Sequence, residues 1–183
     1  MEAVNTYPKT YFVGIPIIGI IFIAMSFGQI DPFILLMYEL LLLFAYVAAV
    51  WDAKLRIIPN SLILCMLAAW VLVMVPKLFI DTGAAVRLLR DSLGGFLIGG
   101  GLFFFVYLVS RKGLGGGDVK FMAASGLYLG FGGVLSAMLL GTMLAAFVGL
   151  ILIAAKKIGR KDAIPLAPFL YVGILMTVFI AWK

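Results

Sequence analysis

Long apolar runs separated by short polar segments dominate the sequence. Most runs have about 18–22 residues, the length that an α-helix needs to cross a hydrocarbon core about 30 Å thick. The runs are 11–28, 33–50, 61–80, 93–110, a shorter 119–129, 134–155 and 165–182. None alternates apolar and polar residues as the strands of a membrane barrel do. The pattern predicts an all-α, polytopic membrane helical bundle with about six full spans plus one short helix.

The composition supports a membrane protein. Hydrophobic residues make up 65% of the 183 residues and charged residues 12%, whereas soluble domains are about 45–50% apolar and about 25% charged. The spans use most of the chain, so we expect a single membrane-embedded domain over residues 1–183. The net charge of +6 is then typical of basic cytoplasmic loops beside a lipid bilayer, and nucleic acid is not an expected partner.

The distribution of Lys and Arg predicts the orientation of the spans. The segments 51–60, 111–118 and 156–163 are basic, so we place all three on the cytoplasmic side of an inner (plasma) membrane. The segment 81–92 carries Arg87 and Arg90 against Asp81 and Asp91. We expect a loop there on the opposite side, with a short interfacial amphipathic helix.

This topology requires a helical hairpin between residues 118 and 155. Because both flanking segments lie inside, the chain between them crosses the membrane an even number of times. We expect the turn at 130–133, where three of four residues are Gly, and a short first arm buried by its neighbours. The five glycines among residues 94–101 predict a helix face that packs closely against another helix.

The residues that are missing exclude several kinds of chemistry. The chain has no His and one Cys, so Ser-His and Cys-His catalysis, intrachain disulfides and His/Cys metal sites are excluded. We expect neither a metal nor a cofactor, and we expect Cys65 to be a buried core thiol. Acid–base catalysis must then come from carboxylates, Lys or Tyr.

Three acidic residues lie within or beside apolar runs, where charges are costly and are functional candidates: Glu39, Asp52 and Asp118. Asp52 ends the second run and Asp118 starts the short helix, so both belong to the cytoplasmic edge. Two carboxylates that approach each other share one proton, and such a pair can activate water and protonate an amide nitrogen. Glu39 is about 20 Å from Asp52 along the helix, so we expect it to make a structural hydrogen bond to a neighbouring helix.

The glycines before Asp118 leave two interpretations open. They could let an extended substrate strand approach the carboxylate, or they could form a flexible loop in which Asp118 caps the next helix. A phosphate-binding loop fits poorly, because no Gly-Lys-Ser/Thr follows.

Three segments together resemble one family. Residues 113–130 read GLGGGDVKFMAASGLYLG, residues 52–60 read DAKLRIIPN, and residues 164–170 read IPLAPFL. The first resembles the GxGD motif of the type IV prepilin peptidases, the second their earlier Asp-to-Ile-Pro-Asn motif, and the third their late Pro-x-x-Pro-Phe segment. Ala167 stands where Gly commonly precedes the second Pro of that segment.

The resemblance implies a membrane aspartyl endopeptidase that removes the short basic leader from prepilins or pilin-like precursors, before their hydrophobic helix. The implied catalytic pair is Asp52 and Asp118. The implied supporting residues are Gly115 and Gly117 in the substrate-facing loop, and Pro59 and Asn60 are expected at the start of the third helix. Lys54, Arg56 and Lys120 would repel a basic leader, so we expect them to anchor their loops to lipid phosphate rather than to contact substrate. The chain lacks the paired CxxC motifs of larger members, so we expect a short form without the methyltransferase-associated cytoplasmic domain.

Other functions remain open at this stage. Archaeal preflagellin peptidases are close relatives, and presenilin-like proteases share GxGD but typically have Tyr before the other Asp, where this chain has Trp51. A proton-coupled transporter that uses Asp52, Asp118 and Glu39 is the hypothesis from a different class. It predicts acidic residues near the bilayer midplane.

Overall fold

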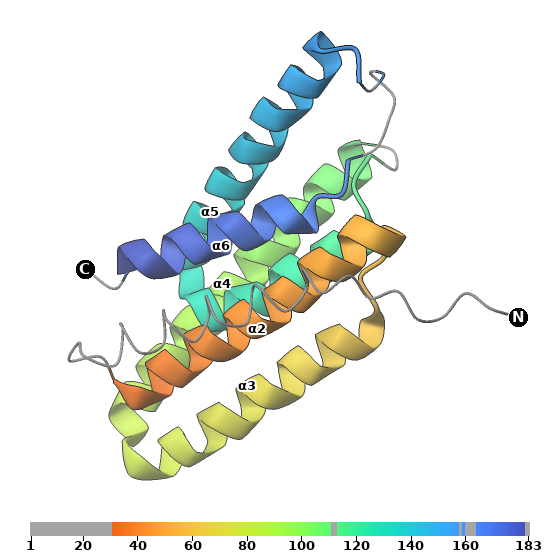
Figure 1. Ribbon diagram of the computed structural model, residues 1–183. Helices are drawn as coiled ribbons and strands as arrows, with labels where there is room; N and C mark the ends of the chain where they lie inside the picture. The colour runs from red at the N-terminus through yellow and green to blue at the C-terminus, as the bar shows by residue number, and fades with distance from the viewer. Residues whose placement is uncertain (1–30, 111–112, 158, 160–163, 182–183) are drawn as a thin grey trace, which may run out of the picture.

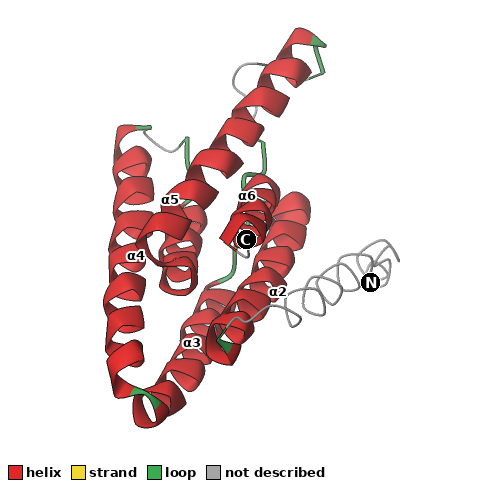
Figure 2. Ribbon diagram, turned by 90° about the vertical axis from the view of Figure 1, so that its left-hand side faces the viewer, coloured by secondary structure: helices red, strands yellow, loops and turns green. Residues whose placement is uncertain are grey.

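The computed structural model describes residues 31–110, 113–157, 159 and 164–181. In this part of the chain all regular structure is helical, as Figure 2 shows. The helices are α2 (Pro32–Leu55), α3 (Asn60–Ile80), α4 (Thr82–Val109), α5 (Gly116–Ala154) and α6 (Ala167–Ala181), labelled in Figure 1. The all-α prediction is confirmed for these residues.

Four of the described helices, α2 to α5, are long and apolar enough to cross a membrane, and α6 is apolar but shorter. The prediction of a membrane helical bundle is therefore confirmed. The predicted count of about six full spans is not confirmed. The run 11–28 lies outside the described residues, and the predicted segments 119–129 and 134–155 both belong to the bent helix α5.

The predicted loop at 81–92 was wrong, because these residues start α4. Only Asp81 separates α3 from α4. Its side chain accepts a hydrogen bond from the Ala84 N–H at 2.9 Å, which satisfies one of the free donors at the start of a helix. From there α4 continues for 28 residues, so no separate interfacial helix forms.

The helix α5 turns back on itself at Gly130, where φ is +70° and ψ is −175°. The first arm (116–129) runs into the bundle, and the second arm (131–154) returns toward the end at which α5 begins (Figure 1). Asp91 of α4 accepts a hydrogen bond from the Phe131 N–H at 3.1 Å, so a carboxylate from another helix caps the second arm. The predicted hairpin is present, with its turn at Gly130.

Glycines bring the backbones of α4 and the first arm together. A Cβ atom on Gly95 would overlap the carbonyl oxygen of Gly126, and one on Gly99 would lie 2.6 Å from the carbonyl oxygen of Met122. Both glycines are therefore required by close helix packing, as predicted. Gly101 is different, because a Cβ atom there would meet nothing within 4 Å.

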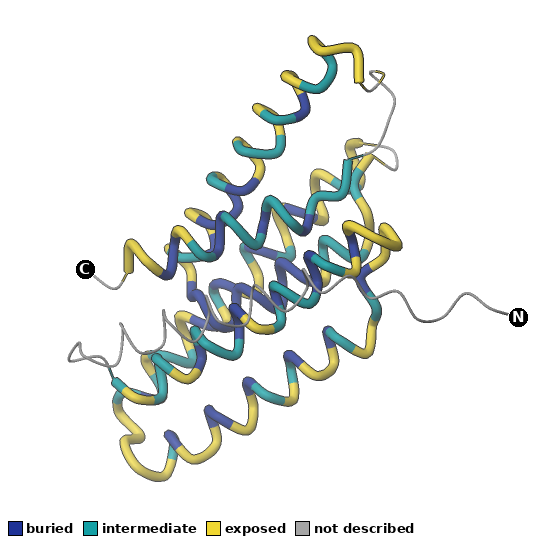
Figure 3. The backbone as a smooth tube through the Cα atoms, viewed as in Figure 1, coloured by how far each residue is buried: buried dark blue, intermediate teal, exposed yellow. Residues whose placement is uncertain are grey.

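The first arm is the central element of the bundle. Every residue from 121 to 130 is buried, and in Figure 3 buried backbone gathers where the helices face one another. Two hydrogen bonds join the neighbouring helix α3 to the first arm. Trp70 Nε1 donates to the Leu127 carbonyl at 3.0 Å, and the Tyr128 hydroxyl donates to the Met66 carbonyl.

The prediction that Cys65 is buried was wrong, because the structure exposes this thiol. One face of α3, which includes Met66 and Trp70, is buried against the bundle, and Cys65 lies on the other side. In a membrane helix the outer face is also apolar, so an apolar run does not distinguish core residues from exposed ones.

At the far end of the bundle an ion pair ties α2 to α3. Asp31 caps α2 by accepting from the Phe33 N–H at 2.8 Å, and it also accepts from the Lys77 ammonium group. Burial raises the pKa of the Asp31 carboxyl, but the hydrogen bonds from Lys77 and Phe33 together hold it below its ordinary value. Asp31 is therefore the charged partner that the buried Lys77 requires.

The turn of α5 predicts unequal effects at two nearby glycines. Gly130→Ala places a side chain in a left-handed conformation and in the space of the Asp91 carboxylate, so we expect it to destabilise the protein by about 2–4 kcal/mol. Gly132→Ala enters open space and should leave stability unchanged or raise it by up to about 1 kcal/mol. Thermal unfolding in detergent measures both, and equal melting temperatures would contradict the steric account.

Candidate active site

Three segments far apart in the sequence surround one cavity of about 320 Å³, called the aspartate cavity below. They are the end of α2, the loop before α5 and the segment before α6. The lining residues are Asp52, Arg56, Gly113, Leu114, Gly115, Asp118, Ile164, Pro165 and Leu166. Two of the three segments that were predicted to share one side of the membrane, 51–60 and 111–118, thus contribute to one cavity, and the lining residues 164–166 directly follow the third in the sequence.

Asp52 is held in the last turn of α2 and is only 6% exposed. The helix ends just after it, because Arg56 adopts a left-handed conformation (φ +54°) and its N–H donates to the Asp52 carbonyl. One carboxylate oxygen, Oδ2, accepts a hydrogen bond from the Ala167 N–H at 2.9 Å. Since Ala167 begins α6, the Asp52 side chain caps the start of that helix, where an acidic side chain interacts favourably with the helix dipole.

Asp118 has a different environment, although it lines the same cavity. It lies in the first turn of α5, and its Oδ1 atom is buried without a hydrogen-bond partner among the described residues. A buried carboxyl oxygen without a donor, beside another carboxylate, is more stable as a neutral acid.

Two of the glycines before Asp118 have distinct steric roles. A Cβ atom on Gly115 would lie 2.9 Å from Asp118 Oδ2, so Gly115 leaves room for the carboxylate. A Cβ atom on Gly117 would lie 3.1 Å from the Ile58 Cβ atom, and Gly117 is not among the residues that line the cavity. Gly115 therefore shapes the aspartate cavity, and Gly117 packs the start of α5 against the segment before α3.

Pro59, Asn60 and Lys120 lie near the cavity without lining it. Pro59 precedes α3 and Asn60 is its first residue, as predicted. Lys120 Nζ donates to Asn60 Oδ1 at 2.9 Å on the surface. Lys120 therefore joins the start of α3 to the start of α5, a contact between helices that was not expected for a lipid anchor.

Glu39 is not part of this site. It belongs to the same continuous helix as Asp52, more than three turns before it. Its Oε1 atom is buried without a hydrogen-bond partner in the described part of the chain, so the predicted structural hydrogen bond is not present at that atom.

Sequence reasoning missed two contributions to the site. Arg56 was assigned to loop anchoring, but it lines the cavity with the two carboxyl groups. The donor to Asp52 is a backbone N–H, and residue types do not indicate such a donor. The sequence did contain one signal for it, because the pair Pro165 and Pro168 is typical of a helix start, where backbone N–H groups are free. Within the described residues, no three His, Cys, Asp or Glu side chains gather into a group that could hold a metal ion.

Comparisons with known proteins give a consistent result. The model of the type IV leader peptidase family matches residues 39–154. A "Prepilin leader peptidase/N-methyltransferase" of Aeromonas hydrophila is 30% identical over 123 residues, which are 67% of this chain and 41% of the relative. Proteins with the same name from Legionella pneumophila (29% over 149 residues, 79% and 50%) and Bacillus subtilis (26% over 136 residues, 71% and 50%) are also similar.

The matched part spans about two fifths to one half of the length of these curated relatives. No solved structure matches the chain.

Proposed function

Because the chain belongs to the type IV leader peptidase family, we propose that it is a membrane aspartyl endopeptidase that removes the short basic leader from prepilins or pilin-like precursors. The observation that carries this proposal is the convergence of Asp52 and Asp118 from two helices on one cavity. Similarity to curated prepilin leader peptidases supports the substrate class. Residues 1–183 act as one membrane-embedded peptidase domain.

The site faces the cytoplasm from the inner membrane in this proposal. Support comes from the basic segments 51–60 and 111–118, which contribute lining residues of the cavity, and from the basic segment 156–163, which directly precedes the lining residues 164–166 in the sequence. A transporter would instead place its acidic residues along a path near the midplane. Asp52 and Asp118 lie at helix ends, and Glu39 is about 20 Å away along α2, an arrangement that favours the peptidase.

We assign different roles to the two carboxyl groups. Asp52, hydrogen-bonded to the Ala167 N–H, is the charged general base, and Asp118 is the neutral acid. Water adds to the carbonyl carbon of the scissile peptide, its proton passes to Asp52, and the Asp118 proton passes to the carbonyl oxygen. When the C–N bond breaks, the amine nitrogen takes the proton from Asp52 and Asp118 recovers its own. The guanidinium of Arg56, in the same cavity, lowers the repulsion between the two acids.

Replacement of either carboxyl group tests the proposal directly. Asp52→Asn and Asp118→Asn keep the side-chain shape but remove the base or the acid, so each should lower the rate of cleavage at least about 100-fold. Purified protein in liposomes is incubated with a pilin precursor from the same genome, and the new N-terminus of the product is sequenced. A well-folded Asp52→Asn variant that cuts at the normal position and rate would refute the dyad.

The backbone donor to Asp52 can be removed by proline, which has no N–H. Ala167 is the first residue of α6, a position at which proline fits the helix. In Ala167→Pro, loss of this hydrogen bond frees the Asp52 carboxylate to leave its catalytic position, so we expect kcat for precursor cleavage to fall about 10-fold. Ala167→Gly keeps the N–H and is the control. Steady-state cleavage kinetics measure the effect, and equal kcat values for the proline and glycine variants would exclude this role of the amide.

Gly115 and Gly116 form a second matched pair. Gly115→Ala pushes against Asp118 Oδ2, whereas a Cβ atom on Gly116 meets nothing within 4 Å. Displacement of a reacting group by a fraction of an ångström to 1 Å lowers rates by up to about 100-fold. We expect Gly115→Ala to lower kcat at least about 10-fold, with melting temperature and KM nearly unchanged, and Gly116→Ala to resemble the wild type. Steady-state cleavage kinetics measure both variants, and equal kcat values for Gly115→Ala and Gly116→Ala would argue against the steric role of Gly115.

A further inference from the structure

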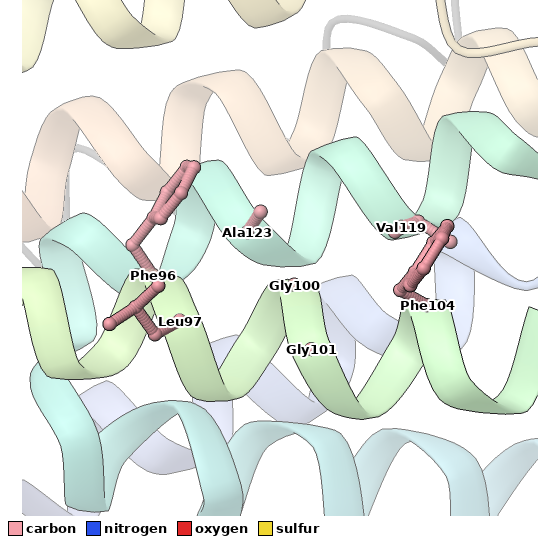
Figure 4. A pocket seen from close by; sticks show the side chains of 7 residues that line it. All are labelled: Phe96, Leu97, Gly100, Gly101, Phe104, Val119 and Ala123. Carbon is pink, nitrogen blue, oxygen red and sulfur yellow. The ribbon is translucent and has the colours of Figure 1, made fainter.

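A second cavity of about 320 Å³ lies between α4 and the first arm of α5, and it is lined only by apolar residues. It is called the seam groove below and is shown in Figure 4. In that view the rings of Phe96 and Phe104 stand at its two ends, with Ala123 of the first arm between them. Phe96 and Phe104 are eight residues apart, so the groove extends about 12 Å along α4, slightly more than two helical turns.

The floor of the seam groove contains a glycine that the bundle itself does not need. A Cβ atom on Gly100 would meet the Cβ atom of Ala123 at 3.0 Å, whereas one on Gly101 would meet nothing. A glycine in a helix costs about 1 kcal/mol relative to alanine. Gly101 therefore keeps open a space that no described part of this chain fills. Small residues on a membrane helix allow another helix to approach closely.

The first turn of α5 contributes lining residues to both the seam groove and the aspartate cavity. Asp118 lines the aspartate cavity, and the next residue, Val119, lines the seam groove beside Phe104. Successive residues of a peptide chain are less than about 4 Å apart. The linings of the two cavities are therefore adjacent at this turn, and a substrate whose scissile bond lies at Asp118 has the seam groove beside it.

We propose that the seam groove is the docking surface for the apolar helix of the substrate, which lies along α4 and the first arm for about two turns. The inference rests on the proposed peptidase function, in which the cleaved bond adjoins a hydrophobic helix. The two cavities divide the substrate by chemistry. The aspartate cavity contains carboxyl groups for the peptide bond, and the seam groove offers no charged or polar side chain, so it suits only an apolar segment.

Filling the groove tests this assignment. Gly101→Leu adds a side chain to open space, and Gly132→Leu does the same at an exposed glycine of the second arm that does not line the groove. For the full-length precursor we expect Gly101→Leu to lower kcat/KM at least about 10-fold, mainly through a higher KM. A peptide with the cleavage site but without the apolar helix should be cut equally by both variants. Equal kcat/KM of the two variants for the full-length precursor would overturn the docking surface.

Disulfide cross-linking provides a readout that does not depend on cleavage or on the folding of the leucine variant. Gly101→Cys and Gly132→Cys are prepared in a Cys65→Ser, Asp118→Asn background, which keeps the precursor uncut. The precursor carries single cysteines along its apolar helix. Because a disulfide requires Cα atoms about 4.4–6.8 Å apart, we expect cross-links at Gly101→Cys, periodic along the precursor helix, and background levels at Gly132→Cys.

The combined outcomes separate the two proposals. If wild type leaves the precursor uncut while Gly101→Cys cross-links, the peptidase function fails and the docking surface stands. If wild type cuts the precursor while Gly101→Cys gives no more cross-link than Gly132→Cys, the peptidase stands and the groove is only a lipid-filled surface.

Discussion

Where α5 turns back at Gly130, the backbone is left-handed and the Asp91 carboxylate occupies the space of a side chain while it caps the second arm. This contact satisfies a backbone N–H that the reversal leaves free at the start of the second arm. The reversal returns the chain to the end of the bundle at which α5 began. The start of α6, 115 residues after Asp52, can therefore meet Asp52 at the end of the bundle where Asp118 also lies.

The first arm of α5 both packs the bundle and positions Asp118. Its buried length, residues 121–130, is the packing centre for α3 and α4, fastened by the backbone contact at Gly95 and by the hydrogen bonds of Trp70 and Tyr128. Its first turn presents Asp118 to one cavity and Val119 to another. A rigid, deeply packed helix thus positions the carboxyl group, and such precision matters because catalytic rates fall steeply when reacting groups are displaced.

The fold also makes two chemically identical side chains different. Asp52 accepts a backbone hydrogen bond at the positive end of α6, whereas an oxygen of Asp118 is buried without any described donor. The acid–base pair that we propose needs such an asymmetry, since one member must be charged and the other neutral. It arises because α6 begins beside the end of α2, so the proline-containing segment before α6 becomes part of the site without contributing a catalytic side chain.

The sequence alone determined the all-helical membrane class, the hairpin at the glycine-rich turn, the close-packed glycine face and the two acidic residues that share a cavity. These features depend on local hydrophobicity, on the charge of short segments and on the close backbone approach that glycine allows. Each of these properties follows directly from the residue types. Only the tertiary structure decided that residues 81–92 continue α4, that Cys65 is exposed, that Lys120 joins Asn60, and that the Ala167 N–H holds Asp52. One physical reason is that apolar residues cover both faces of a membrane helix, so residue types do not show which face is buried. The other is that every residue except proline has the same backbone N–H, so residue types do not show which N–H will bind a carboxylate.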